Sequence, residues 1–99
     1  MQIRHGDVLL ETIEKLPEGK YETKKDSVVA EGEVTGHAHR IVGAAVLQNQ
    51  LNELFIDVGM DADVRISHEE HGTVKIPAGT WKTIQQQEYT PERIQRVVD

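Results

Sequence analysis

Hydrophobic and polar residues alternate along this chain in short runs, a pattern that predicts β-strands. Residues 62–67 and 73–76 alternate with a period of two, which is typical of strands that bury one face. Residues 7–13 centre on an apolar run and are followed by a turn that contains Pro17 and Gly19. We therefore expect a strand in each of these three segments.

The middle of the chain, residues 41–58, permits two interpretations. β-branched residues are frequent in it and a polar break at 48–50 interrupts it, so two short strands fit the pattern best. The alternative is a single helix from Ala44 to Leu54.

The end of the chain predicts a strand followed by a helix. Residues 80–87 alternate, with Trp81 on one face of the strand and Lys82 on the other. Thr90 suits a helix N-cap and the proline after it suits the first helical position. We expect a short C-terminal helix at about residues 90–98, docked on the sheet.

The aliphatic positions of these strands form the expected core, together with two large rings. The residues are Val8, Leu10, Val28, Val46, Leu54, Ile56, Val64, Ile66, Val74, Ile76 and Ile84, with Phe55 and Trp81. A chain of 99 residues has room for one such core, so we expect a single domain spanning residues 1–99. Many short strands with closely spaced turns predict a mostly β fold, a small barrel or sandwich with the short C-terminal helix.

Composition excludes several classes of chemistry. The chain contains no cysteine, so disulfides, thiolate metal sites and cysteine nucleophiles are absent. The net charge of −6 and the scattered Lys and Arg residues argue against a long nucleic-acid footprint. No apolar run has the length of a signal peptide or membrane span, so we expect a cytoplasmic protein without a membrane partner. Aromatic residues are only 4% of the chain, and a homo-oligomer would supplement so small a core.

Four of the five histidines fall in two tight pairs. His37 and His39 are one residue apart, so on a strand both imidazoles face the same side. His68 and His71 are three residues apart, a spacing that a compact turn would place on one side. Each pair alone could also be exposed histidines or a solvated loop. Together they predict a shared site for a divalent transition metal, Zn, Fe, Mn, Ni or Cu.

Charged residues near the pairs are the candidates for further chemistry. Glu69 and Glu70 could act as a ligand or a general base. Arg40 and Lys82 could hold a small anionic ligand or the phosphate of a short RNA, although pairing with surface carboxylates is the commoner fate of an arginine.

The first histidine stands apart from the two pairs. His5 is expected to be structural or to lie on the surface. Asp7 could accept a hydrogen bond from an imidazole, although an Asp at the start of a strand more often bonds its own backbone.

Two motifs resemble those of cupins, which are small metal-binding β-barrels. His37-Ala38-His39 is similar to the first cupin motif, H-x-H, and Pro77-Ala78-Gly79 to the P-x-G of the second. The glutamate that cupins carry after H-x-H is absent, and Lys82 occupies the position of the second motif's histidine. The resemblance therefore implies that His68, His71 or a glutamate completes the ligand set.

The chain also resembles a group of small uncharacterised bacterial and phage proteins. The matching segments are Gly6-Asp7-Val8-Leu9-Leu10, Gly32 to Arg40, His68 to His71, Pro77-Ala78-Gly79 and Glu88-Tyr89-Thr90-Pro91. This resemblance implies one complete small protein and no particular mechanism.

Three functions follow as alternatives. The first is a metal-binding β-domain whose histidine site takes a small anionic ligand or substrate. The second is a metal-free phosphodiesterase or RNase-like enzyme that uses histidines as acid and base. The third is a structural or regulatory homo-oligomer of phage or bacterial origin, with the histidines at an interface. The sequence favours the first and leaves open whether the protein is an enzyme.

Overall fold

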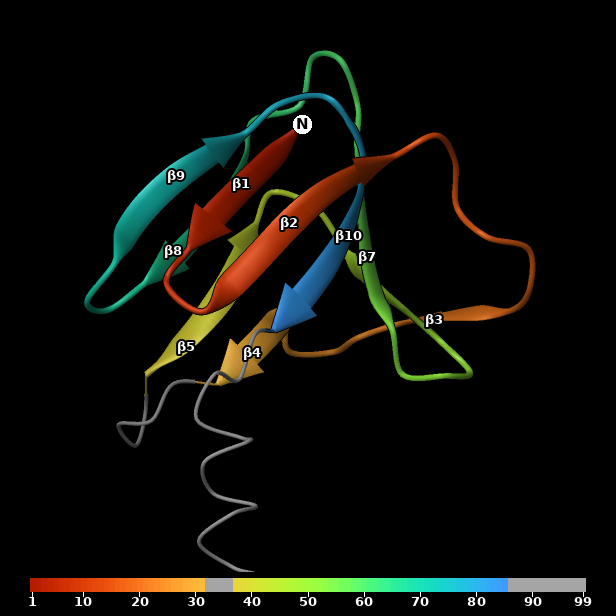
Figure 1. The fold of residues 1–99 in the computed structure, drawn as a ribbon, viewed down its shortest axis with the longest axis horizontal. Coiled ribbons are helices and arrows are strands. Elements are labelled where there is room, and N and C mark those ends of the chain that lie inside the picture. Colours follow the sequence, from red (N-terminus) through yellow and green to blue (C-terminus); the bar gives the residue numbers. More distant parts are fainter. Residues whose placement is uncertain (32–36, 86–99) are drawn as a thin grey trace, which may run out of the picture.

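The computed structural model describes residues 1–31 and 37–85, which are almost entirely strands and turns (Figure 1). The described strands are β1 (Gln2–His5), β2 (Val8–Ile13), β3 (Tyr21–Thr23), β4 (Val28–Glu31), β5 (Ala38–Val42), β6 (Val46–Asn49), β7 (Leu54–Val58), β8 (Val64–His68), β9 (Gly72–Ile76) and β10 (Gly79–Gln85). The strands expected in 7–13, 62–67, 73–76 and 80–87 are confirmed as β2, β8, β9 and the described part of β10.

The strands form two sheets in which every pairing is antiparallel. The first sheet has the order β1-β2-β10-β7-β6-β3 and the second has the order β4-β5-β8-β9. Within the described ranges the strands close into no barrel and include no helix, so the barrel alternative and the cupin topology are not observed. The expected C-terminal helix at 90–98 lies outside the described residues.

One hydrophobic core is shared by the two sheets. Its members are Val8, Leu10, Val29, Ala30, Ile41, Val46, Ile56, Val58, Val64, Ile66, Ile76 and Trp81. Phe55 is also buried, so both expected large rings are inside. Val28, Leu54 and Ile84 are half-buried. The expectation for Val74 is wrong: the residue is 36% exposed because the core reaches only the end of β9, where Ile76 is fully buried.

A turn replaces the alternative helix from Ala44 to Leu54, which is therefore wrong. The side-chain Oδ1 of Asn49 accepts hydrogen bonds from the backbone N–H groups of Leu51 and Glu53. Asn52 adopts a positive φ of 64°, a conformation that Asn tolerates better than most residues. These features end β6 and start β7. In the ranges 1–31 and 37–85 no helix is long and apolar enough to cross a membrane.

Candidate metal centre

Histidines from both sheets meet at one end of the core. His5 is the last residue of β1 in the first sheet. His39 on β5 and His68 at the end of β8 belong to the second sheet, and His71 lies in the turn that leads to β9. Because Arg40 pairs with Ser67 in the antiparallel register, His39 and His68 come side by side, with ring centroids 4.4 Å apart.

Three of these imidazoles form what we call the inner group, His39, His68 and His71. One potential ligand atom from each residue lies within 4.8 Å of the others. His39 is 1% exposed and His68 is 8% exposed, whereas His71 lies on the exposed side. Three imidazoles with an accessible side are a ligand set that Zn²⁺ and related ions use in proteins.

A second set, the outer group, consists of His37, His68 and Glu69. Their potential ligand atoms also lie within 4.8 Å of one another. Nδ1 of His37 is 3.2 Å from a carboxylate oxygen of Glu70, so a hydrogen bond there leaves Nε2 of His37 with its lone pair. His68 is common to both groups.

Two acceptors outside the inner group orient the rings of His5 and His39. Nε2 of His5 lies 3.0 Å from the carbonyl oxygen of Gly72, and Nε2 of His39 lies 3.2 Å from the carboxylate of Asp7. An oxygen acceptor requires a protonated nitrogen opposite it, so both neutral rings carry their proton on Nε2. Their Nδ1 atoms, which hold the lone pairs, are 2.9 Å from each other.

The hydrogen bonds of His68 determine its tautomer as well. Its Nδ1 accepts the backbone N–H of Glu70 at 2.9 Å and that of His71 at 3.3 Å. The proton of the neutral ring is therefore on Nε2. For a neutral His68 ring to bind a metal through Nε2, this proton must move to Nδ1, and the two backbone N–H contacts must be given up.

Burial favours the neutral form of His39 and of His5. Loss of hydration lowers the pKa of His39 to about 4, with the neighbouring His68 and His5 acting in the same direction and Asp7 opposing them. Burial also lowers the pKa of His5, against the hydrogen bond to Gly72. Neutral imidazole is the form that binds metal, so these two rings are available as ligands at neutral pH.

Gly6 allows the β1–β2 turn to approach His71 closely. A Cβ atom at this position would lie 2.7 Å from Nε2 and Cδ2 of the His71 ring. Gly6 also has a φ of +63°, which L side chains rarely adopt. Both requirements are met by glycine, and the turn that contains it presents Asp7 to His39.

Among the charged residues predicted for the site, Glu69 is held by two hydrogen bonds. Glu69 accepts hydrogen bonds from the backbone N–H of Ala38 and from Arg40, both at 2.9 Å. These contacts, the Ala38 bond foremost, lower the pKa of Glu69 to about 2. A carboxylate held ionised in this way is a weak general base near neutral pH.

Lys82 is not brought to the histidines. Its ammonium group pairs with Glu53 at 2.8 Å, on the central part of the first sheet. Arg40 lies near the cluster, but its guanidinium group pairs with Glu69.

Sequence reasoning missed His5, because nothing in the sequence shows that the end of β1 meets β5 and the β8–β9 turn. Of the two alternatives expected for His5, structural or at the surface, the surface position is wrong, since the residue is 3% exposed. The expectation that Asp7 could accept a hydrogen bond from an imidazole agrees with its contact to His39.

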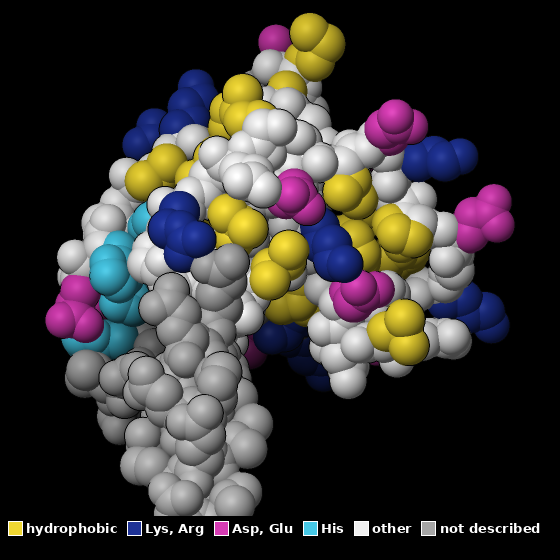
Figure 2. All heavy atoms as spheres, viewed as in Figure 1, with side chains coloured by type: hydrophobic (Ala, Val, Ile, Leu, Met, Phe, Trp, Pro, Cys, Tyr) yellow, Lys and Arg dark blue, Asp and Glu magenta, His cyan; other side chains and the backbone are white. Residues whose placement is uncertain are grey.

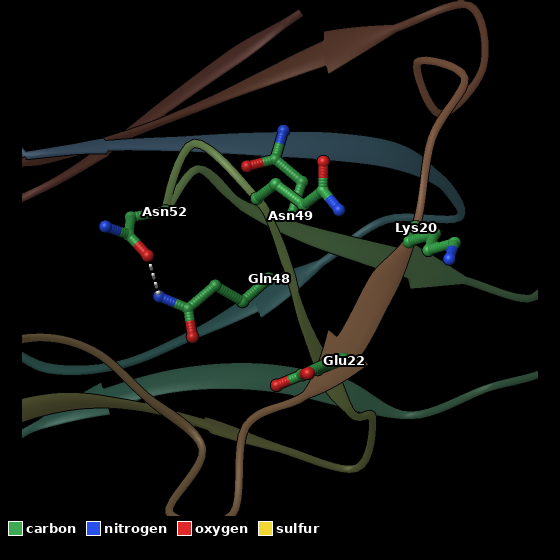
Figure 3. Close-up of a pocket in the computed structure, with 6 residues that line it drawn as sticks. Lys20, Glu22, Gln48, Asn49 and Asn52 are labelled. Carbon is green, nitrogen blue, oxygen red and sulfur yellow. Dashed lines mark hydrogen bonds between the residues drawn. The ribbon is translucent and has the colours of Figure 1, made fainter.

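The histidine cluster reaches the surface on one side of the molecule. Figure 2 shows histidine side chains in one group at the left of the view, with acidic side chains beside them. A separate polar pocket lies at the other edge of the first sheet, around β3 and the β6–β7 turn (Figure 3). Its lining includes Lys20, Glu22, Gln48, Asn49 and Asn52, and the Gln48 and Asn52 amides bond each other across it.

The fold and the cluster together define a two-sheet β protein with a candidate metal centre where its sheets meet. The chain belongs to the family described as a domain of unknown function, DUF8820, whose sequence model matches residues 4–86 and so includes all five histidines. Comparisons with curated proteins and with solved structures found no match. The family agrees with the resemblance to uncharacterised proteins, and it implies neither cupin membership nor a phage or bacterial origin.

Proposed function

We propose that this domain binds one divalent transition metal ion through the inner group, His39, His68 and His71. The observation that supports this most directly is the convergence of three imidazoles from β5, β8 and the following turn, with ligand atoms within 4.8 Å. In a chain without cysteine, imidazole nitrogen is the ligand that Zn²⁺, Fe²⁺, Ni²⁺ and Cu²⁺ share, with Mn²⁺ also possible.

The surroundings of His39 support this role. The bond from Nε2 to Asp7 is the carboxylate–histidine contact that commonly orients metal ligands and raises their basicity. It leaves Nδ1 as the nitrogen for the metal.

The overlap of the two groups supports one ion per chain. A neutral His68 ring has one lone pair, so it can bind one metal ion at most. The inner and outer groups therefore compete for one nitrogen, and His68 cannot bridge two ions. We assign the ion to the inner group because the His68 ring packs between the rings of His39 and His71, whose centroids are 4.4 Å and 4.6 Å away.

Metal analysis tests this function. Protein purified without a histidine tag, stripped with a chelator and titrated with Zn²⁺ is expected to bind one equivalent. His71→Ala should weaken binding at least about tenfold, because it removes a ligand. Thr73→Ala changes an exposed residue of the same hairpin and should leave binding unchanged. Wild-type protein that retains no metal would refute the proposal.

Binding of an anion is a second part of the proposed function and is tested separately from metal binding. Arg40 and Lys82 already pair with Glu69 and Glu53, so neither offers an uncompensated charge to a phosphate. We therefore propose that any anion binds at the accessible side of the metal, next to His71. Shifts of the histidine NMR signals on adding inorganic phosphate to the zinc-loaded protein, and not to the metal-free protein, would support this.

Metal-free acid–base catalysis has less support from the same geometry. A general acid and base must reach the substrate, and because His39 and His68 are almost completely buried, only His37 and His71 of the two pairs could serve.

A further inference from the structure

We propose that His5 is the fourth ligand of this metal, so that the ion joins the two sheets. The proposal rests on the metal binding proposed above and adds a residue from the other sheet. Its basis is the pair of Nδ1 atoms that His5 and His39 direct at each other.

These two nitrogens lack a hydrogen between them. Nε2 of His5 donates to Gly72 and Nε2 of His39 donates to Asp7, so each neutral ring has used its one proton. Two lone pairs then face each other at 2.9 Å in a nearly water-free site. Such a contact is repulsive, and a metal ion bound by both nitrogens would remove the repulsion.

The separation suits a metal ion. Two nitrogens bound to one ion at 2.0–2.1 Å are about 2.9 Å apart at a right angle and about 3.3 Å apart at the tetrahedral angle. The observed 2.9 Å therefore needs an opening of a few tenths of an ångström to match a tetrahedral site.

The arrangement of the four rings agrees with this geometry. In a tetrahedral site of four histidines, ring centroids would be about 5 Å apart. The six centroid distances among His5, His39, His68 and His71 run from 4.4 to 6.5 Å. The shortest separates His39 from His68 and the longest separates His5 from His68.

The consequence is a link between elements that the backbone does not pair. His5 ends β1 at the edge of the six-stranded sheet, whereas His39 and His68 belong to the four-stranded sheet. A four-histidine set would make the N-terminal hairpin part of the metal site, and the anion proposed above would then bind next to His71 as a fifth ligand.

The test compares Zn²⁺ affinity in His5→Ala and Arg4→Ala. Arg4 is the preceding residue of β1 and its side chain is exposed, so it controls for disturbance of the strand. We expect His5→Ala to weaken Zn²⁺ binding at least about tenfold and Arg4→Ala to leave it unchanged. On the wild-type protein, one equivalent of Zn²⁺ should move the ¹⁵N NMR resonance of His5 Nδ1 while Nε2 stays protonated.

The outcomes separate this inference from the proposed function. If wild-type protein binds one Zn²⁺ but the His5 Nδ1 resonance does not move, His5 is not a ligand and the three-histidine proposal stands without it. If wild-type protein binds no Zn²⁺, both proposals fail. The NMR measurement decides even if His5→Ala does not fold, because it uses the unaltered chain.

Discussion

The hydrogen bonds of single imidazoles decide which nitrogens of the cluster can bind a metal. Residue types and spacing predicted four candidate histidines, but the proton position on each ring depends on its partner in the fold. Asp7, Gly72 and the amides after His68 supply those partners. They are set by tertiary contacts, so no motif in the sequence could predict them.

Asp7 should matter for metal affinity although it is not one of the proposed ligands. Asp7→Asn removes the charge that faces Nε2 of His39, so we expect Zn²⁺ binding to weaken by about 10- to 100-fold. Calorimetric titration of the stripped protein measures the change. Asp61→Asn, at an exposed position, is the matched control and should bind as wild type does. Equal affinities for all three proteins would show that the contact does not tune the site.

Protonation of His39 should make the metal-free protein sensitive to acid. The pKa falls from 6.5 to about 4 on folding, so the unfolded chain binds the proton more tightly. The associated stability is complete above about pH 6.5 and is lost as the pH falls towards 4. Between pH 7 and pH 5 we expect a loss of about 2 kcal/mol in the free energy of unfolding. Urea unfolding in the presence of a chelator measures this, and His39→Gln should reduce the difference.

At the scale of elements, alternation predicted the strands well and their ends poorly. The two-residue period found β8, whose burial alternates, and it found β9 as well, although only Ile76 of that strand is buried. The H-x-H spacing predicted that His37 and His39 face the same side. The strand instead begins at Ala38, so His37 lies before the regular alternation and joins the outer group.

The β1–β2 turn offers a test of close packing against the cluster. Gly6→Ala should destabilise the protein and weaken Zn²⁺ binding, because the methyl group would displace the His71 ring. Gly19→Ala, away from the cluster, imposes backbone strain at a φ of +135° but meets nothing within 4 Å. We expect Gly19→Ala to cost about 1–3 kcal/mol in stability and to leave metal affinity unchanged. If both variants lose metal binding equally, strain and not the contact with His71 explains the effect.

At the scale of the whole molecule, the histidine cluster lies at one end of the shared core, where the two sheets meet. Apolar residues from both sheets fill the interior, and His5 and His39 make the contact between sheets beyond it. The sequence predicted a mostly β chain because its strands alternate. It left a barrel and a sandwich open and did not predict which strands pair, since the pairing of β2 with β10 and of β5 with β8 is a long-range choice of register.

The most direct test of the account is the position of a bound ion. Crystals of the untagged protein grown with one equivalent of Zn²⁺, and measured on both sides of the zinc absorption edge, would locate it by anomalous scattering. The account predicts a single peak per chain within bonding distance, about 2.0–2.1 Å, of imidazole nitrogens of His39, His68 and His71. No peak in the cluster, or a peak bound only by His37 and Glu69, would contradict it.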